Sequence, residues 1–187
     1  MTYVLMVKDK ETGNLRERRM RKGSVINDHH DLYAAIMSKY AYEMNSNKEH
    51  FLVFFLNARR ALLGSEIVSI GTLTSTLVHP REVFRPAIVA NAKAIAVAHN
   101  HPTGEASPSP EDIRLTERLA KAGDLLGIEL LDHVIVGKPK EEAKADMNIC
   151  IGNLFVSTVF FHNITVPNKK EHKLPYESLR DRGDFTP

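Results

Sequence analysis

The order of apolar and polar positions along the chain predicts strands that alternate with helices. Short apolar runs rich in strand-forming residues predict four strands, at residues 49–57 (EHFLVFFLN), 61–71 (ALLGSEIVSIG), 93–99 (KAIAVAH) and 128–137 (IELLDHVIVG). Segments with helical spacing or helix-end signals predict three helices, at residues 28–44, 79–92 and 110–126. This order predicts an α/β fold with a central mixed β-sheet flanked by helices.

The two ends of the chain differ from this core in their pattern of apolar and polar residues. Turn residues 11–14 separate two short strand-like segments and predict an N-terminal hairpin over residues 1–27. After the predicted core, residues 28–137, comes a polar and charged stretch with one strand-like segment, NLFVSTVFFHNITV. We interpret residues 138–174 as an insert and residues 175–187 as a separate C-terminal segment.

Composition limits the classes of protein that the chain can belong to. Its 187 residues are 43% hydrophobic and 26% charged, which suits one globular domain with a real core. The net charge of +2 neither favours nor excludes nucleic acid, and the basic tract 16–23 predicts a solvated hairpin face more than a phosphate contact. We expect no membrane span and no secretory leader, and the single cysteine, Cys150, fits a cytoplasmic location. A metal site here would use His, Asp and Glu.

The stretch HNHPTGEASPSPED, residues 99–112, carries the strongest chemical signal. Alternation along a strand places His99 and His101 on one face and Asn100 on the other. Two imidazoles on one face suit a single zinc ion, which takes histidine nitrogens at ~2.0–2.1 Å. The loop that follows can return Asp112 to the two histidines. Two imidazoles and one carboxylate would leave a fourth zinc position for water, as in catalytic sites.

A simpler interpretation explains part of the same stretch. Ser109 is a good N-cap, Pro110 suits the first helical position, and Asp112 falls where a capping box needs its acidic residue. The joint spacing of His-x-His, Ser and Asp favours the metal site over capping alone.

A zinc-bound water would also need a base. The acidic candidates are Glu49, Glu66, Glu105 and Asp132, of which Glu49 is modestly favoured because it stands at the mouth of a core strand. Asp132 and His133 are also candidates for contacts behind the ligands, although a histidine satisfied within the core is an equal alternative.

His99-x-His101, Ser109 and Asp112, together with the upstream Glu49, have a spacing that resembles the JAMM (MPN+) metalloprotease motif. This resemblance implies a zinc ion bound by His99, His101 and Asp112, with Glu49 as general acid/base. It also implies that Ser109 stabilises the oxyanion formed when water attacks a carbonyl.

The RadC-like branch of that family is the closer match, over residues 49–137. It implies the JAB/MPN, cytidine-deaminase-like architecture. Longer RadC-like proteins carry an N-terminal helical region of DNA-binding type, in place of which this sequence predicts the hairpin. In those proteins a final Tyr-x-Ser segment follows soon after the strand that ends in DHVIVG. The segment YESLRDRG resembles that ending, but here residues 138–174 separate it from the strand.

We therefore expect a zinc-dependent metallohydrolase whose activated water attacks an amide bond in a peptide or protein substrate. The alternative is a non-enzymatic, DNA-repair-associated or adaptor protein that keeps the fold. An HNH nuclease is excluded because its three motif residues are dispersed and not adjacent. The sequence leaves a nucleic-acid partner open but gives it no support. The strand-like segment of the insert could join copies of the chain into a homo-oligomer.

Overall fold

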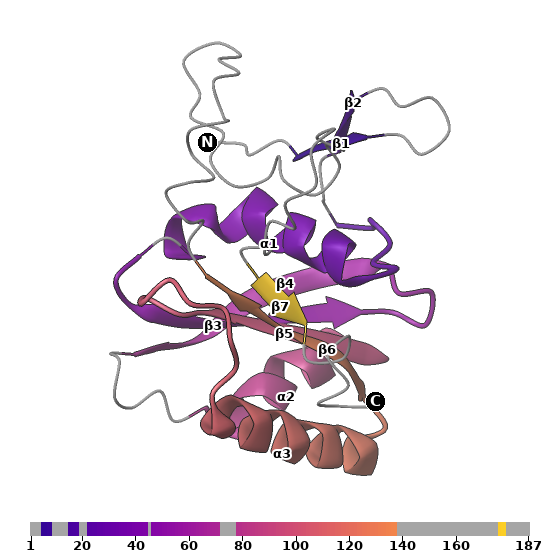
Figure 1. Ribbon diagram of the computed structural model, residues 1–187. Coiled ribbons are helices and arrows are strands. Elements are labelled where there is room, and N and C mark those ends of the chain that lie inside the picture. The colour runs from indigo at the N-terminus through magenta and orange to yellow at the C-terminus, as the bar shows by residue number, and fades with distance from the viewer. Residues whose placement is uncertain are drawn as a thin grey trace.

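The computed structural model describes residues 5–8, 15–18, 22–44, 46–71, 78–137 and 176–178. The helices are α1 (His29–Met44), α2 (Pro80–Val89) and α3 (Pro110–Leu126). The strands are β1 (Leu5–Lys8), β2 (Leu15–Arg18), β3 (Glu49–Leu56), β4 (Leu62–Gly71), β5 (Ala94–Asn100), β6 (Glu129–Val136) and β7 (Tyr176–Ser178). Figure 1 shows a central sheet between α1 on one face and α2 and α3 on the other.

The main sheet is mixed, as predicted. Its five strands follow the order β4-β3-β5-β6-β7, with β5 and β6 parallel and the other neighbours antiparallel. The α/β fold class is therefore confirmed, and the four predicted core strands are β3 to β6. Strand β7 is a fifth strand that the sequence pattern did not predict. Within the region predicted as an N-terminal hairpin, β1 and β2 pair antiparallel, and the turn between them lies outside the described residues.

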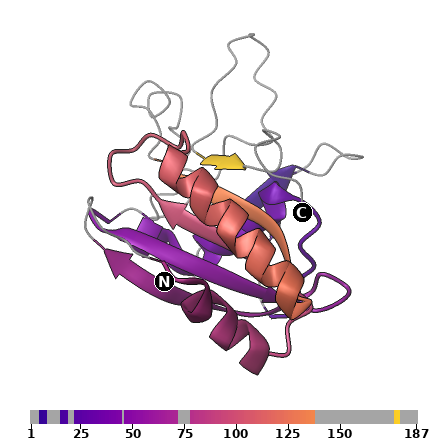
Figure 2. The same cartoon turned by 90° about the horizontal axis from the view of Figure 1, so that it is seen from below.

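Each central strand is buried on both faces, which explains its unbroken apolar sequence. Along β3, Leu52, Phe54 and Leu56 pack into the core beneath α1. The alternate residues Phe51, Val53 and Phe55 pack with α2 and α3. Figure 2, seen from below, shows α2 and α3 on the same side of the sheet.

The predicted helix ends form as expected. The Asp28 carboxylate accepts a hydrogen bond from the backbone N–H of Asp31, 2.9 Å away, and so caps α1. Ser109 is the N-cap of α3. Gly127 follows the last turn of α3 with φ 66°, in the left-handed region that favours glycine at helix ends.

Strand β6 contains an irregularity that determines where its polar residues face. Ile95 of β5 pairs with Leu130, and Val97 pairs with His133, so β6 has one extra residue opposite Ala96. Leu131 therefore packs on the α1 side, and Asp132 lines a pocket on that side beside it. The strand after the bulge turns His133 to the α3 side.

Some predictions fall outside the described residues. The insert at 138–174 with its strand-like segment does so, as do the side chains of most of the basic tract. Among the described residues, no helix combines the length and hydropathy needed to cross a membrane.

Candidate metal centre

Strand β5 ends with the first of the predicted ligands. His99 is 1% exposed, and its ring stacks on that of Phe51 with 5.9 Å between centroids. Asn100 points to the opposite face, as predicted. Its Oδ1 accepts from the N–H of His50 at 2.8 Å, and its Nδ2 donates to the carbonyl of Lys48 at 2.9 Å. Asn100 thus ties the end of β5 to the start of β3, and it fixes the strand end from which His99 projects.

The three predicted ligands converge. Nε2 of His99 lies 3.0 Å from Nε2 of His101 and 3.2 Å from Oδ1 of Asp112. Nε2 of His101 lies 3.3 Å from Oδ2 of Asp112. Ligands at ~2.0–2.1 Å from a tetrahedral zinc ion are about 3.3 Å apart, so these separations match one shared ion. Within the described residues, this is the one group of three or more such side chains able to hold a metal.

Asp112 is held as a carboxylate by its neighbours. Its Oδ2 accepts from both the backbone N–H and the hydroxyl of Ser109, each at 2.7 Å, and its own N–H donates back to that hydroxyl oxygen. Burial would raise the pKa of Asp112, but the neighbouring His101, His99 and Ser109 hold it well below the usual range. The capping box predicted as the alternative is therefore present together with the cluster of ligands.

His101 has a defined orientation. Its Nδ1 lies 2.7 Å from the carbonyl oxygen of Glu105. Since a carbonyl can only accept, Nδ1–H is the donor and the neutral ring has its lone pair on Nε2, facing the other ligands. Burial lowers the pKa of His101, but Asp112, the Glu105 carbonyl and the charge of Glu49 outweigh burial and raise it.

Glu49 lies on the same face as the ligands. It begins β3, and Phe51 of that strand pairs with His99 of β5. Continuing this antiparallel register by two residues sets Glu49 opposite His101, and alternation directs its side chain to the α3 side. Glu49 is half-buried, and its charge reaches His101.

The other three acids have different surroundings. Glu66 is exposed and pairs with Val53, in the middle of β3. The side chain of Glu105 is exposed, and this residue contributes its backbone carbonyl to the site. Asp132 lies on the opposite side of the sheet, where its carboxylate accepts from the hydroxyl of Ser178 at 2.9 Å.

Two residues behind the ligands complete the arrangement. Nε2 of His133 lies 2.8 Å from Nδ1 of His99, and Nδ1 of His133 lies 2.6 Å from the hydroxyl oxygen of Thr116. Burial, then the neighbouring His99, holds the pKa of His133 well below its usual value. Sequence reasoning offered His133 as one of two alternatives and missed Thr116. Its position four residues after Asp112, on the same helix face, was the available signal.

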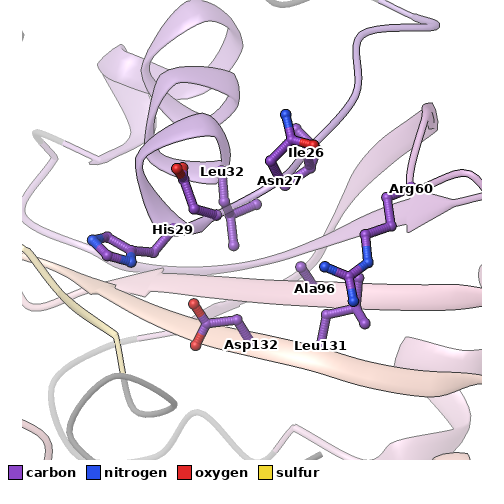
Figure 3. A pocket seen from close by; sticks show the side chains of 9 residues that line it. Ile26, Asn27, His29, Leu32, Arg60, Ala96, Leu131 and Asp132 are labelled. Atoms are coloured by element: carbon purple, nitrogen blue, oxygen red, sulfur yellow. The ribbon is translucent and has the colours of Figure 1, made fainter. Parts of the chain in front are cut away.

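The opposite face of the sheet carries a separate pocket of about 240 Å³ (Figure 3). It lies between the start of α1 and strands β5 and β6, with the carboxylate of Asp132 on its floor. Its lining residues are Ile26, Asn27, Asp28, His29, Leu32, Arg60, Ala96, Leu131 and Asp132. The sheet separates this pocket from the three converging ligands.

The donor set suits zinc. Two imidazoles and one carboxylate are common zinc ligands, and three protein ligands leave a fourth position for water or substrate. His99 and Asp112 are buried and His101 is half-buried, so a bound ion would have a protein wall and a solvent-facing side.

Comparison with known proteins shows which family the sequence resembles. Residues 26–145 match the RadC-like JAB domain. A UPF0758 protein of Rubrobacter xylanophilus is 53% identical over 94 residues, which are 50% of this chain and 41% of that protein. A UPF0758 protein of Desulfitobacterium hafniense is 47% identical over 113 residues, 60% of this chain and 48% of the relative. A UPF0758 protein of Methanosarcina acetivorans is 44% identical over 107 residues, which are 57% of this chain and 45% of that protein. The matched part spans less than half the length of these relatives.

Proposed function

The chain belongs to the family of RadC-like JAB domains, and on that premise we propose that it is a zinc-dependent hydrolase of amide bonds. The supporting observation is the convergence of His99, His101 and Asp112, with Glu49 on the same face of the sheet. Zinc bound by these ligands would act as a Lewis acid and lower the pKa of a water molecule.

Glu49 is the proposed general base. It would take a proton from the attacking water and pass it to the leaving amine, and its half-buried position opposite His101 supports this role. It does not belong to the converging group, so its role would be proton transfer without metal binding.

Ser109 is the proposed oxyanion donor. Its hydroxyl contacts Oδ2 of Asp112, and its backbone N–H holds the same oxygen independently. The hydroxyl can therefore turn to a substrate oxygen while the carboxylate stays in place. A hydrogen bond that forms as charge develops would stabilise the transition state.

The proposed substrates are peptides or proteins, in the cytoplasm. The names of the relatives state no reaction, and the matched region is less than half of each relative. A non-enzymatic adaptor, associated with DNA repair, is the competing outcome in the experiment below.

The test combines metal analysis with a peptide-library cleavage screen on four proteins: wild type, His99→Ala, Glu49→Gln and the matched control Glu66→Gln. Wild type should carry about one zinc per chain and cleave peptides, whereas His99→Ala should carry almost none. Glu49→Gln should keep the zinc but lose ~10²–10⁴-fold in rate, because a base is not a ligand. Glu66→Gln should match wild type.

Three results would contradict the proposal. Equal, near-zero zinc in wild type and His99→Ala would remove the metal site. Loss of zinc in Glu49→Gln would make Glu49 a ligand. Zinc binding without any peptide cleavage would favour the adaptor.

A further inference from the structure

Thr116 and His133 connect two of the ligands, Asp112 and His99, through one continuous line of hydrogen bonds. The hydroxyl of Thr116 donates to the backbone carbonyl of Asp112 at 2.7 Å and also contacts Nδ1 of His133 at 2.6 Å. Nε2 of His133 then contacts Nδ1 of His99 at 2.8 Å. The line begins at the backbone of one ligand and ends at the ring of another.

The direction of every bond in this line follows from its first member. A carbonyl oxygen can only accept, so the single proton of the Thr116 hydroxyl is used on Asp112. The contact between Thr116 and His133 must then have Nδ1–H of His133 as its donor. His133 is 0% exposed and bonds to a hydroxyl and another imidazole, so its neutral form is favoured and its Nε2 has a lone pair.

The same logic reaches the metal ligand. Since Nε2 of His133 accepts, Nδ1–H of His99 must donate to it. A neutral His99 with its proton on Nδ1 has its lone pair on Nε2, the atom that faces His101 and Asp112.

We propose that Thr116 and His133 are positioning residues that fix the tautomer of His99 and so prepare its Nε2 to bind the metal. This inference rests on the metal-binding part of the proposed function and not on hydrolysis. Without the hydrogen bonds from Thr116 through His133, His99 could carry its proton on Nε2 and donate it to the Asp112 carboxylate 3.2 Å away. That proton would block the atom that binds the metal. The Thr116 hydroxyl opposes that arrangement.

Thr116→Val and Thr116→Ser form a matched pair of variants for the test. Valine keeps the shape of this buried side chain but removes the hydroxyl, whereas serine keeps the hydroxyl. In Thr116→Val, Nδ1–H of His133 has lost its acceptor, so the proton should move to Nε2. We expect zinc affinity to fall about 10–100-fold in Thr116→Val, the range typical for partners of metal-bound histidines, and to stay within about threefold of wild type in Thr116→Ser.

The tautomer itself is a second readout that needs neither zinc nor activity. Long-range ¹H–¹⁵N NMR of the zinc-free proteins should show the Nδ1–H form of His133 in wild type and Thr116→Ser. The Nε2–H form should appear in Thr116→Val. A change of packing alone would not move this proton.

A second pair of variants replaces His133 and keeps the proposal testable if Thr116→Val fails to fold. His133→Gln retains an oxygen able to accept from His99 and should bind zinc more tightly than His133→Leu by about tenfold. Unchanged zinc affinity and an unchanged His133 tautomer in Thr116→Val would overturn the inference, as would equal affinities in the His133 pair. If wild type bound no zinc, both the proposed function and the metal-binding part of this inference would fail, whereas the NMR spectra would still show whether the Thr116 hydroxyl fixes the tautomer of His133.

Discussion

Ser109 performs a structural task that can be separated from its proposed chemical one. As the N-cap of α3, its hydroxyl accepts from the backbone N–H of Asp112. Ser109→Ala should therefore lower the free energy of unfolding by about 1 kcal/mol. If the hydroxyl also stabilises an oxyanion, kcat should fall by about 10²-fold or more with a modest change in KM.

Ser109→Gly is the matched variant for this prediction. Glycine at an N-cap costs only a few tenths of a kcal/mol, yet it also removes the hydroxyl. Denaturant unfolding and steady-state kinetics on both variants should show unequal stabilities and equal losses in kcat. Near-normal turnover in Ser109→Gly would leave Ser109 as a cap alone.

At the scale of single residues, the sequence predicted the cluster of ligands because alternation and capping are local rules. Those rules placed His99 and His101 on one face and Asp112 at the start of a helix. The face of Glu49 depends on how β3 pairs with β5, which the sequence left open. The contact between His133 and His99 depends on a bulge in β6, for which the sequence has no signal.

At the scale of elements, the close approach of the end of β6 to the loop after β5 is a sensitive point. A Cβ atom on Gly137 would lie 2.4 Å from the carbonyl oxygen of Gly104 and 3.0 Å from the N of Ala106. Gly137→Ala must therefore displace backbone in the loop where the Glu105 carbonyl accepts from His101. We expect a loss of about 1–3 kcal/mol in stability and weaker zinc binding.

Gly64→Ala is the control for this prediction, since its Cβ would meet only a Phe55 ring carbon at an ordinary 3.6 Å. Thermal unfolding and zinc titration of both variants provide the comparison. Equal zinc affinity in Gly137→Ala and wild type would show that the loop moves without disturbing His101.

The elements themselves were predictable to different degrees. Strands β3, β5 and β6 are buried on both faces, and their apolar runs are strong local signals. Strand β7 has only three residues, and it forms because β6 offers a pairing edge to a segment far away in the chain. A pattern along the sequence cannot contain that information.

At the scale of the whole molecule, metal binding should stabilise the fold. A ligand at 100 times its Kd adds about 2.7 kcal/mol, which for a chain of this size raises Tm by roughly 5–10 °C. Scanning calorimetry with zinc and with a chelator should show this shift in wild type. His99→Ala should show almost none.

The size of this shift should depend on pH in a defined direction. In the metal-free protein the pKa of His101 is raised, so its protonated form adds stability below its usual value of about 6.5. That stability is lost as pH rises through the raised pKa. Zinc needs the neutral ring, so the increase in Tm should be larger at pH 8 than at pH 6. A larger increase at pH 6 would contradict the assignment of His101 as a ligand.

The bulge in β6 reverses the alternation of side chains between the two faces of the sheet for every residue that follows it in the strand. In a regular strand that kept the pairing of Leu130 with Ile95, Asp132 would face the α3 side and His133 the α1 side. The carboxylate would then stand near His99, and the imidazole would line the pocket beneath α1. The extra residue exchanges the two, so an acid and a base that are neighbours in sequence serve opposite sides of one sheet.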